Sequence, residues 1–142
     1  MKSFQEYIVE SKKGAPKRIP QKRGGGSYMK FLSKDSKHAT VEDTRKVVKK
    51  MSSKLGLGDI RDGNSGKTGH ADSKANTLTT DNMISAVGSI GGTNIKFYDG
   101  RDGVVSYSRV FFELDGKAYA IDARRFDNGN ATMDFEGFSS YL

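Results

Sequence analysis

The fold is decided by Val104-Val-Ser-Tyr-Ser-Arg-Val-Phe-Phe-Glu-Leu114, Asp115-Gly116 and Lys117-Ala-Tyr-Ala-Ile-Asp122. Asp-Gly between two runs rich in β-branched and aromatic residues is a strong signal for a two-residue hairpin turn. Side chains alternate between the two faces of a strand, so the first run divides into two sets. One set is Val105, Tyr107, Arg109 and Phe111, and the other is Val104, Val110, Phe112 and Leu114.

Further strands are expected on both sides of this hairpin. Asn94–Tyr98 predicts a strand that ends in a turn at Asp99–Gly103, and Asp127–Gly129 predicts another turn. Thr132–Phe135 predicts a last strand at the edge of the sheet. Most of the aromatic residues lie in this half of the chain, so the folded core is expected here as an antiparallel meander.

Two helices are predicted before the meander. Thr40 is a good N-cap, Asp43 completes a weak capping box, and Gly56 is a natural stop. A second, shorter helix is expected from Asp81 to Ile90. Residues 56–80 are rich in Gly, Asp, Ser, Asn and Thr and predict a long mobile loop. The class is therefore α+β, with a domain over residues 28–142.

The positive charge of the chain is concentrated in its first half. The 142 residues carry a net charge of +7 and no cysteine. Residues 11–55 hold fourteen Lys or Arg and three acids, whereas residues 56–142 hold nine and twelve. Such a basic half is typical of a nucleic-acid partner. The absence of an apolar run of about eighteen residues predicts no membrane-spanning segment, and no cofactor is indicated.

Residues 11–27 predict a flexible, disordered basic arm. The segment holds both prolines and one isolated large apolar residue, Ile19. Its three basic doublets recur every five residues and are expected to contact phosphates, each contact releasing a counterion. The alternative is a solvated linker. The basic residues predicted to bind nucleic acid, in the arm and on the first helix, are Lys12, Lys13, Lys17, Arg18, Lys22, Arg23, Arg45, Lys46, Lys49 and Lys50.

The first helix allows three interpretations. Its apolar positions, from Val41 to Leu55, share one face, and lysine and arginine cover much of the rest. Such a helix packs on its own core with a solvated outer face, or binds nucleic acid, or lies on an anionic membrane. The first of these is the commonest case.

The first ten residues, Met1-Lys-Ser-Phe-Gln-Glu-Tyr-Ile-Val-Glu10, form a separate amphipathic unit. In a helix, Phe4, Tyr7 and Ile8 share one face. A helix this short is marginal in water and needs a partner surface. About eighteen residues without an apolar face follow it, which is unusual for a core helix. The segment is therefore interpreted as a docking peptide, and the alternative is the first helix of the domain itself.

This peptide resembles the capsid-targeting peptide of internal head proteins of T-even-type bacteriophages. The shared features are Met-Lys, an aromatic residue at position four or five, a second aromatic followed by Ile or Leu, and a Glu. The family's prohead protease cuts after Glu when Ile or Leu stands two residues earlier. Ile8-Val9-Glu10 fits that rule and places the cut before Ser11. The resemblance covers residues 1–10 only.

The resemblance implies how the protein would reach the phage head and then the host. Phe4, Tyr7 and Ile8 would dock on the prohead scaffold, and the prohead protease would remove the peptide. The mature chain would be packaged in the capsid with double-stranded DNA and injected into the host cytoplasm. Known proteins of this class imply that the body binds or inhibits a host defence protein and is not an enzyme.

Two other functions stay open. One is a nucleic-acid-binding protein, without sequence preference, that keeps its N-terminal helix. The other is a small co-injected enzyme that modifies host proteins, although the sequence offers no convincing catalytic site. No cysteine is present and no serine lies in a nucleophile-elbow context, so the usual covalent chemistries lack their residues.

Three weaker patterns complete the search for chemistry. Gly63-Asn-Ser-Gly66-Lys67-Thr68 is not a P-loop, because Arg61 stands where the first glycine is needed. His70 and Asp72, near Asp59 and Asp62, match no metal-site spacing and are interpreted as solvated loop residues. A basic and aromatic surface for single strands is weakly indicated by Tyr107, Arg109, Tyr119, Arg124 and Arg125.

Overall fold

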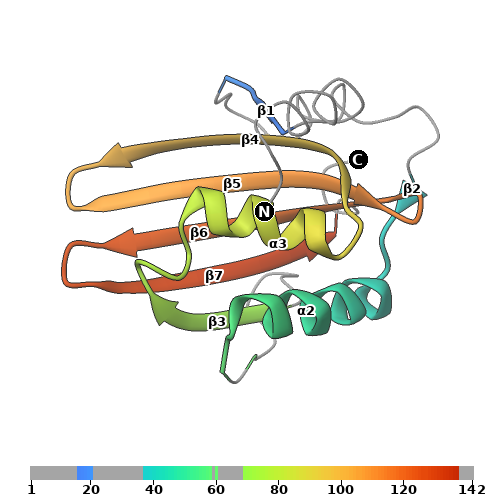
Figure 1. Ribbon diagram of the computed structural model, residues 1–142, viewed down its shortest axis with the longest axis horizontal. Coiled ribbons are helices and arrows are strands. Elements are labelled where there is room, and N and C mark those ends of the chain that lie inside the picture. The colour runs from blue at the N-terminus through green and yellow to red at the C-terminus, as the bar shows by residue number, and fades with distance from the viewer. Residues whose placement is uncertain (1–15, 21–36, 59, 61–68, 138–142) are drawn as a thin grey trace, which may run out of the picture.

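The fold is α+β, as predicted: an antiparallel sheet carries two helices (Figure 1). The structure is a computed structural model that describes residues 16–20, 37–58, 60 and 69–137. The helices are α2 (Val41–Leu55) and α3 (Thr80–Ser89). The strands are β1 (Lys17–Arg18), β2 (Lys37–His38), β3 (Gly69–Lys74), β4 (Thr93–Asp102), β5 (Val105–Leu114), β6 (Lys117–Phe126) and β7 (Asn130–Gly137).

The sheet has the order β1-β4-β5-β6-β7-β3, and β2 pairs with the start of β6. The five strands from β4 to β3 are antiparallel, whereas the two-residue strands β1 and β2 pair in parallel. The predicted meander is therefore confirmed. The edge position predicted for the last strand is wrong, because β3 pairs with β7 along its whole length.

The Asp115-Gly116 hairpin has the predicted turn. Both residues have positive φ, 52° and 77°, as a type I′ turn requires. The preceding turn in the chain, between β4 and β5, differs from expectation. Asp99–Asp102 extend β4 and pair with β5, so the chain reverses at Gly103-Val104.

The loop predicted over residues 56–80 is interrupted by regular structure. Gly69–Lys74 form β3, and α3 already begins at Thr80. Only Ala71 among the residues of β3 is a buried apolar residue, so the segment lacks the alternation that marks a strand. Its extended conformation comes from backbone pairing with β7, a partner about sixty residues away in the sequence.

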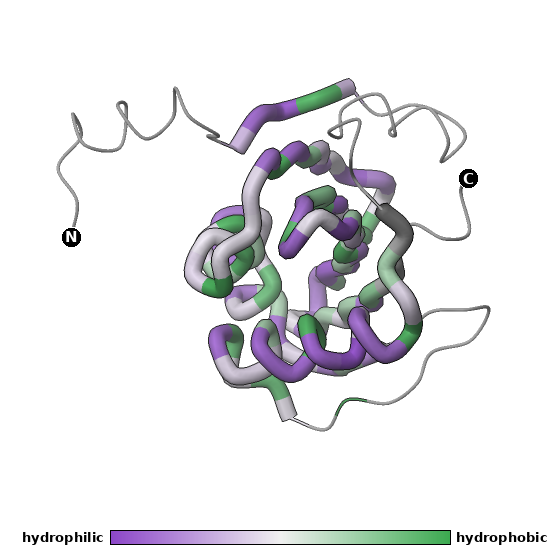
Figure 2. The backbone as a smooth tube through the Cα atoms, turned by 90° about the vertical axis from the view of Figure 1, so that its right-hand side faces the viewer, coloured by the Kyte–Doolittle hydropathy of each residue, from purple (hydrophilic) through white to green (hydrophobic). Residues whose placement is uncertain are grey.

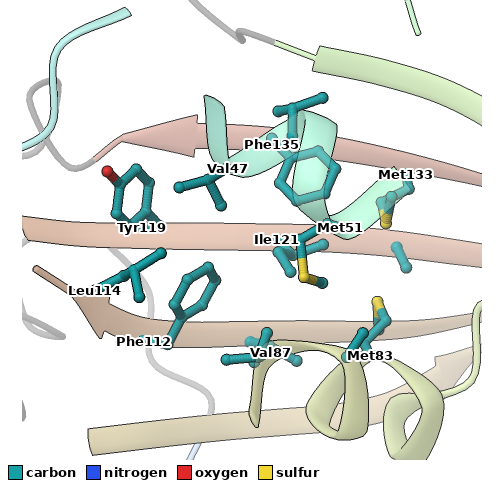
Figure 3. Packing of buried hydrophobic residues seen from close by; sticks show 14 of the residues in the cluster. Val47, Met51, Met83, Val87, Phe112, Leu114, Tyr119, Ile121, Met133 and Phe135 are labelled. Atoms are coloured by element: carbon teal, nitrogen blue, oxygen red, sulfur yellow. The ribbon is translucent and has the colours of Figure 1, made fainter. Parts of the chain in front are cut away.

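Both helices cover the same face of the sheet and close the main core. Val47 and Met51 of α2 and Met83 and Val87 of α3 meet the sheet residues Phe112, Ile121 and Phe135 (Figure 3). All seven are almost completely buried. The predicted parity of β5 holds, because Val110, Phe112 and Leu114 face the helices. Hydrophilic residues predominate along α2 between these apolar positions (Figure 2).

A capping box fixes the start of α2, as the sequence predicts. Thr40 accepts a hydrogen bond from the Asp43 backbone N–H at 3.0 Å, and Asp43 accepts one from the Thr40 N–H at 3.1 Å. Lys117 of β6 lies 2.9 Å from the same carboxylate and so ties the helix to the sheet. These contacts, with Lys117 the largest cause, lower the pKa of Asp43 to about 2.

The carboxyl group of Asp43 is therefore expected to titrate near pH 2 in an NMR experiment. Its ordinary pKa is 3.8, so the stabilisation is complete above about pH 4 and is lost as the pH falls through 2. Lys117→Gln is expected to move the midpoint upward, and Lys74→Gln, remote from the cap, is the control. A midpoint near 3.8 in the parent protein would contradict this account of the cap.

Candidate functional site

The structure describes six of the ten predicted nucleic-acid-binding residues, and it places them in two groups. Lys17 and Arg18 lie on β1 at the β4 edge of the sheet. The other four lie on α2, which packs on α3 and on β7. In Figure 1 these groups stand at opposite edges of the sheet. The described residues therefore do not form one continuous basic surface. The remaining four, Lys12, Lys13, Lys22 and Arg23, lie outside the described residues, as do Phe4, Tyr7, Ile8, Glu10 and Ser11.

The disorder predicted for the basic arm is wrong for residues 16–20. Lys17 and Arg18 pair with Lys96 and Phe97 of β4, and Ile19 donates its backbone N–H to the Phe97 carbonyl at 2.8 Å. The Ile19 side chain is 3% exposed. One apolar residue therefore anchors the segment, because an existing strand edge supplies the backbone partners that the segment lacks alone.

Arg18 is held by the fold itself. Its guanidinium lies 2.5 Å from an Asp99 carboxylate oxygen and 5.0 Å from the centre of the Phe97 ring. The hydrogen bond from Arg18 is the main cause that lowers the pKa of Asp99. Asp99 also accepts from Thr80, whose hydroxyl meets Ser108. Because its charge is already paired with Asp99, Arg18 is expected to contribute less to nucleic-acid binding than the lysines of α2, and its contact with nucleic acid stays a prediction.

The outer face of α2 is basic and exposed. Lys46, Lys50 and Lys54 follow one another at four-residue spacing, and Arg45 and Lys49 lie beside them. Lys46, Lys49, Lys50 and Lys54 have no acidic partner among the described residues. Like charges at this spacing destabilise a helix slightly in the absence of an anion. This face is the described surface best suited to a polyanion.

The second face of the sheet, opposite the helices, carries a polar grid. Successive rows across the strands are Tyr98, Arg109, Asp122, Asp134 and His70, then Gly100, Tyr107, Arg124, Thr132 and Asp72. At the Asp115-Gly116 end of this face Phe111, Ala118 and Ala120 are buried. Toward the other end the side chains become half-buried or exposed.

The predicted basic and aromatic surface is only partly assembled. Tyr107, Arg109 and Arg124 share the second face, whereas Tyr119 and Arg125 face the helices. Tyr119 stacks on Phe112 at 5.5 Å, and burial raises its pKa to about 12. Arg125 donates to Ser108 and to the Leu78 carbonyl. These last two residues therefore support the core.

An open recess of about 400 Å³ lies on the second face, near the two turns that follow β4 and β6. Its lining combines aromatic and charged side chains with one valine. They are Tyr98, Asp102, Val105, Tyr107, Asp122, Arg124 and Phe126. Tyr98 and Tyr107 meet edge to face at 6.3 Å. The sequence indicates Tyr107 and Arg124 but not the other lining residues, because their proximity depends on the register of β4, β5 and β6.

His70 is part of this grid and not of a solvated loop. Its Nδ1 lies 2.7 Å from Asp134 and its Nε2 lies 3.4 Å from Asp72. In the described part of the chain no three His, Cys, Asp or Glu side chains are grouped to hold a metal ion. Asp59, Asp62 and the glycine-rich segment from Gly63 to Thr68 lie outside the described residues.

Comparisons with protein families, with curated proteins and with solved structures found no match. Of the helices that the structure describes, neither has the length and apolar composition needed to cross a membrane. The functional assignment therefore depends on the residues of this chain, and two surfaces stand out: the basic face of α2 and the recess on the second face of the sheet.

Proposed function

We propose that this chain is an internal head protein of a bacteriophage, packaged with double-stranded DNA and delivered into the host. The observation that carries the proposal is the sequence of residues 1–10, which joins an amphipathic peptide to an Ile8-Val9-Glu10 junction. The peptide docks on the prohead scaffold, and the prohead protease cuts between Glu10 and Ser11. The α+β body then acts in the host cytoplasm by binding a host defence protein.

The outer face of α2 supports contact with packaged DNA. Its lysines lie on a rigid helix held by the capping box, and they present several charges to one side. Binding of this kind releases condensed counterions and needs no base sequence. The same face also supports the second candidate, a nucleic-acid-binding protein that retains its N-terminal helix. The state of the N-terminus distinguishes the two.

Cleavage is expected to require Glu10. When the full chain is co-expressed with a T-even-type prohead protease, its intact mass should correspond to a chain that begins at Ser11. Glu10→Gln should leave the chain uncut, because the protease requires the acid at this position. Processing is then lost completely and not merely slowed.

Glu6→Gln is the matched control for this experiment. It removes the same charge from the same peptide, but Phe4 stands two residues before Glu6, where the junction needs Ile or Leu. Glu6→Gln should therefore be cut like the parent chain. An intact parent chain beside an active protease, or cutting of Glu10→Gln, would overturn the proposed junction.

A further inference from the structure

The ring of Tyr107 lies across the backbone of β4. Gly100 pairs with Tyr107, and a Cβ added to Gly100 would stand 2.5 Å from the Tyr107 hydroxyl and 2.8 Å from the ring carbon that bears it. A side chain at position 100 would therefore collide with the ring. Glycine inside a strand weakens it and often marks a place where another group approaches closely. Here that group is the ring of Tyr107, which covers the backbone of β4 at Gly100 and lines the recess.

Arg124 is the positively charged residue that lines this recess. It pairs directly with Tyr107 across β5 and β6, and it is exposed. The structure describes six arginines, and Arg124 is the one of them without an ion pair, hydrogen bond or ring contact. A guanidinium left without a partner beside an aromatic ring is suited to a planar ligand with hydrogen-bond acceptors.

Asp122 stands two residues before Arg124 on the same face of β6, about 7 Å along the strand. Its carboxylate forms an ion pair with Arg109 at 3.7 Å, and a carboxylate has lone pairs for more than one partner. Phe126 stands on the other side of Arg124 and also lines the recess. The recess therefore combines the aromatic ring of Tyr107, the carboxylate of Asp122, which accepts from N–H groups, and the guanidinium of Arg124, which donates to oxygen or nitrogen.

We infer that this recess binds a guanine base of a single-stranded nucleic acid. Guanine stacks on the Tyr107 ring, presents O6 and N7 to Arg124 and presents its N1–H and N2–H groups to Asp122. Adenine, cytosine and thymine each lack one of these two complementary edges. Stacking alone accepts any base, so the preference for guanine comes from the pair of charged side chains.

The charges of the recess favour recognition of a base over contact with phosphates alone. Asp102 and Asp122 line it together with the single cation Arg124, so it is not a basic groove. Paired DNA hides the N1–H edge of guanine, so the ligand is an unpaired base and not the packaged duplex. The inference goes beyond the proposed function and stands or falls independently of the cleavage at Glu10.

The test compares labelled oligo-dT probes that differ in one central base, by fluorescence anisotropy with the full chain. Every probe carries the same charge, so contacts of α2 with phosphates cancel. The dG probe is expected to bind about tenfold more tightly than the dA or all-dT probe. Equal affinity for the three probes would overturn the inference.

Variants then assign the preference to the recess. Arg124→Gln is expected to abolish the preference for dG, and Arg101→Gln, which removes the same charge from an arginine paired with Asp127, is expected to keep it. Gly100→Ala should displace the Tyr107 ring and weaken binding of all probes. If Gly100→Ala fails to fold, Tyr107→Phe and Tyr107→Leu test the same wall of the recess. Tyr107→Phe is expected to retain stacking of the base, and Tyr107→Leu is expected to lose it. A preference unchanged in Arg124→Gln would contradict the assignment.

Discussion

Phe112→Ala is expected to lower the free energy of unfolding by about 3 to 5 kcal/mol, a large part of the stability of a domain this size. Phe112 is completely buried between α3 and the sheet. Its ring stacks on Tyr119 with an angle of 23° between the planes. The substitution removes the favourable free energy of transferring the ring from water into the core. It also leaves a cavity, because the close-packed neighbours in the helices and the sheet cannot relax enough to fill it.

Urea or guanidinium denaturation followed by circular dichroism would measure this loss. Val104→Ala is the matched control, because Val104 is 63% exposed at the turn between β4 and β5. That control should change the free energy of unfolding by no more than about 0.5 kcal/mol. A loss below about 1 kcal/mol for Phe112→Ala would show that the face between helices and sheet is not the main core.

Replacing Lys46, Lys49 and Lys50 together by glutamine should flatten the salt dependence of binding to double-stranded DNA. Each lysine that neutralises a phosphate contributes about 0.9 to the slope of log affinity against log salt concentration. The triple variant is therefore expected to lose about 2 to 3 from that slope. Glutamine is a good helix former and these positions are exposed, so the fold should persist.

Arg18→Gln is an informative comparison for this prediction. It also removes one positive charge, but Arg18 is paired with Asp99 at the other edge of the sheet. Its slope is expected to stay close to that of the parent chain, whereas Lys50→Gln alone should lower the slope by about one. An unchanged slope in the triple variant would remove α2 from the DNA surface.

The sequence predicts the parts of this fold that local signals determine. The Asp115-Gly116 turn, the capping box at Thr40 and the stop at Gly56 each depend on a few neighbouring residues. The alternation along β5 also identifies which residues face the helices. These elements are the ones where local preference and tertiary packing agree.

The missed elements depend on partners far away in the chain. β1 consists of two charged residues, and its pairing requires the edge of β4. β3 has one buried apolar residue and is extended because β7 lies beside it. The Asp and Gly residues around Gly100 predict a turn, yet Gly100 belongs to β4, where it makes room for Tyr107.

The residues of the recess also depend on contacts between distant parts of the chain, which the sequence does not reveal. Tyr98, Tyr107 and Arg124 come from three strands and meet only through the register of β4, β5 and β6. The basic and aromatic residues were visible in the sequence, but their division between the two faces was not. Arg125 and Tyr119 are the same residue types as Arg124 and Tyr107, but they lie on the face that packs against the helices.

Residues 1–10 are proposed to direct the protein to the prohead and to be removed during assembly of the phage head. The most direct test is the intact mass of this protein recovered from purified particles of the phage. We expect a mass that corresponds to a chain beginning at Ser11. A chain that still carries Met1 inside the particles, or particles that lack the protein, would contradict it.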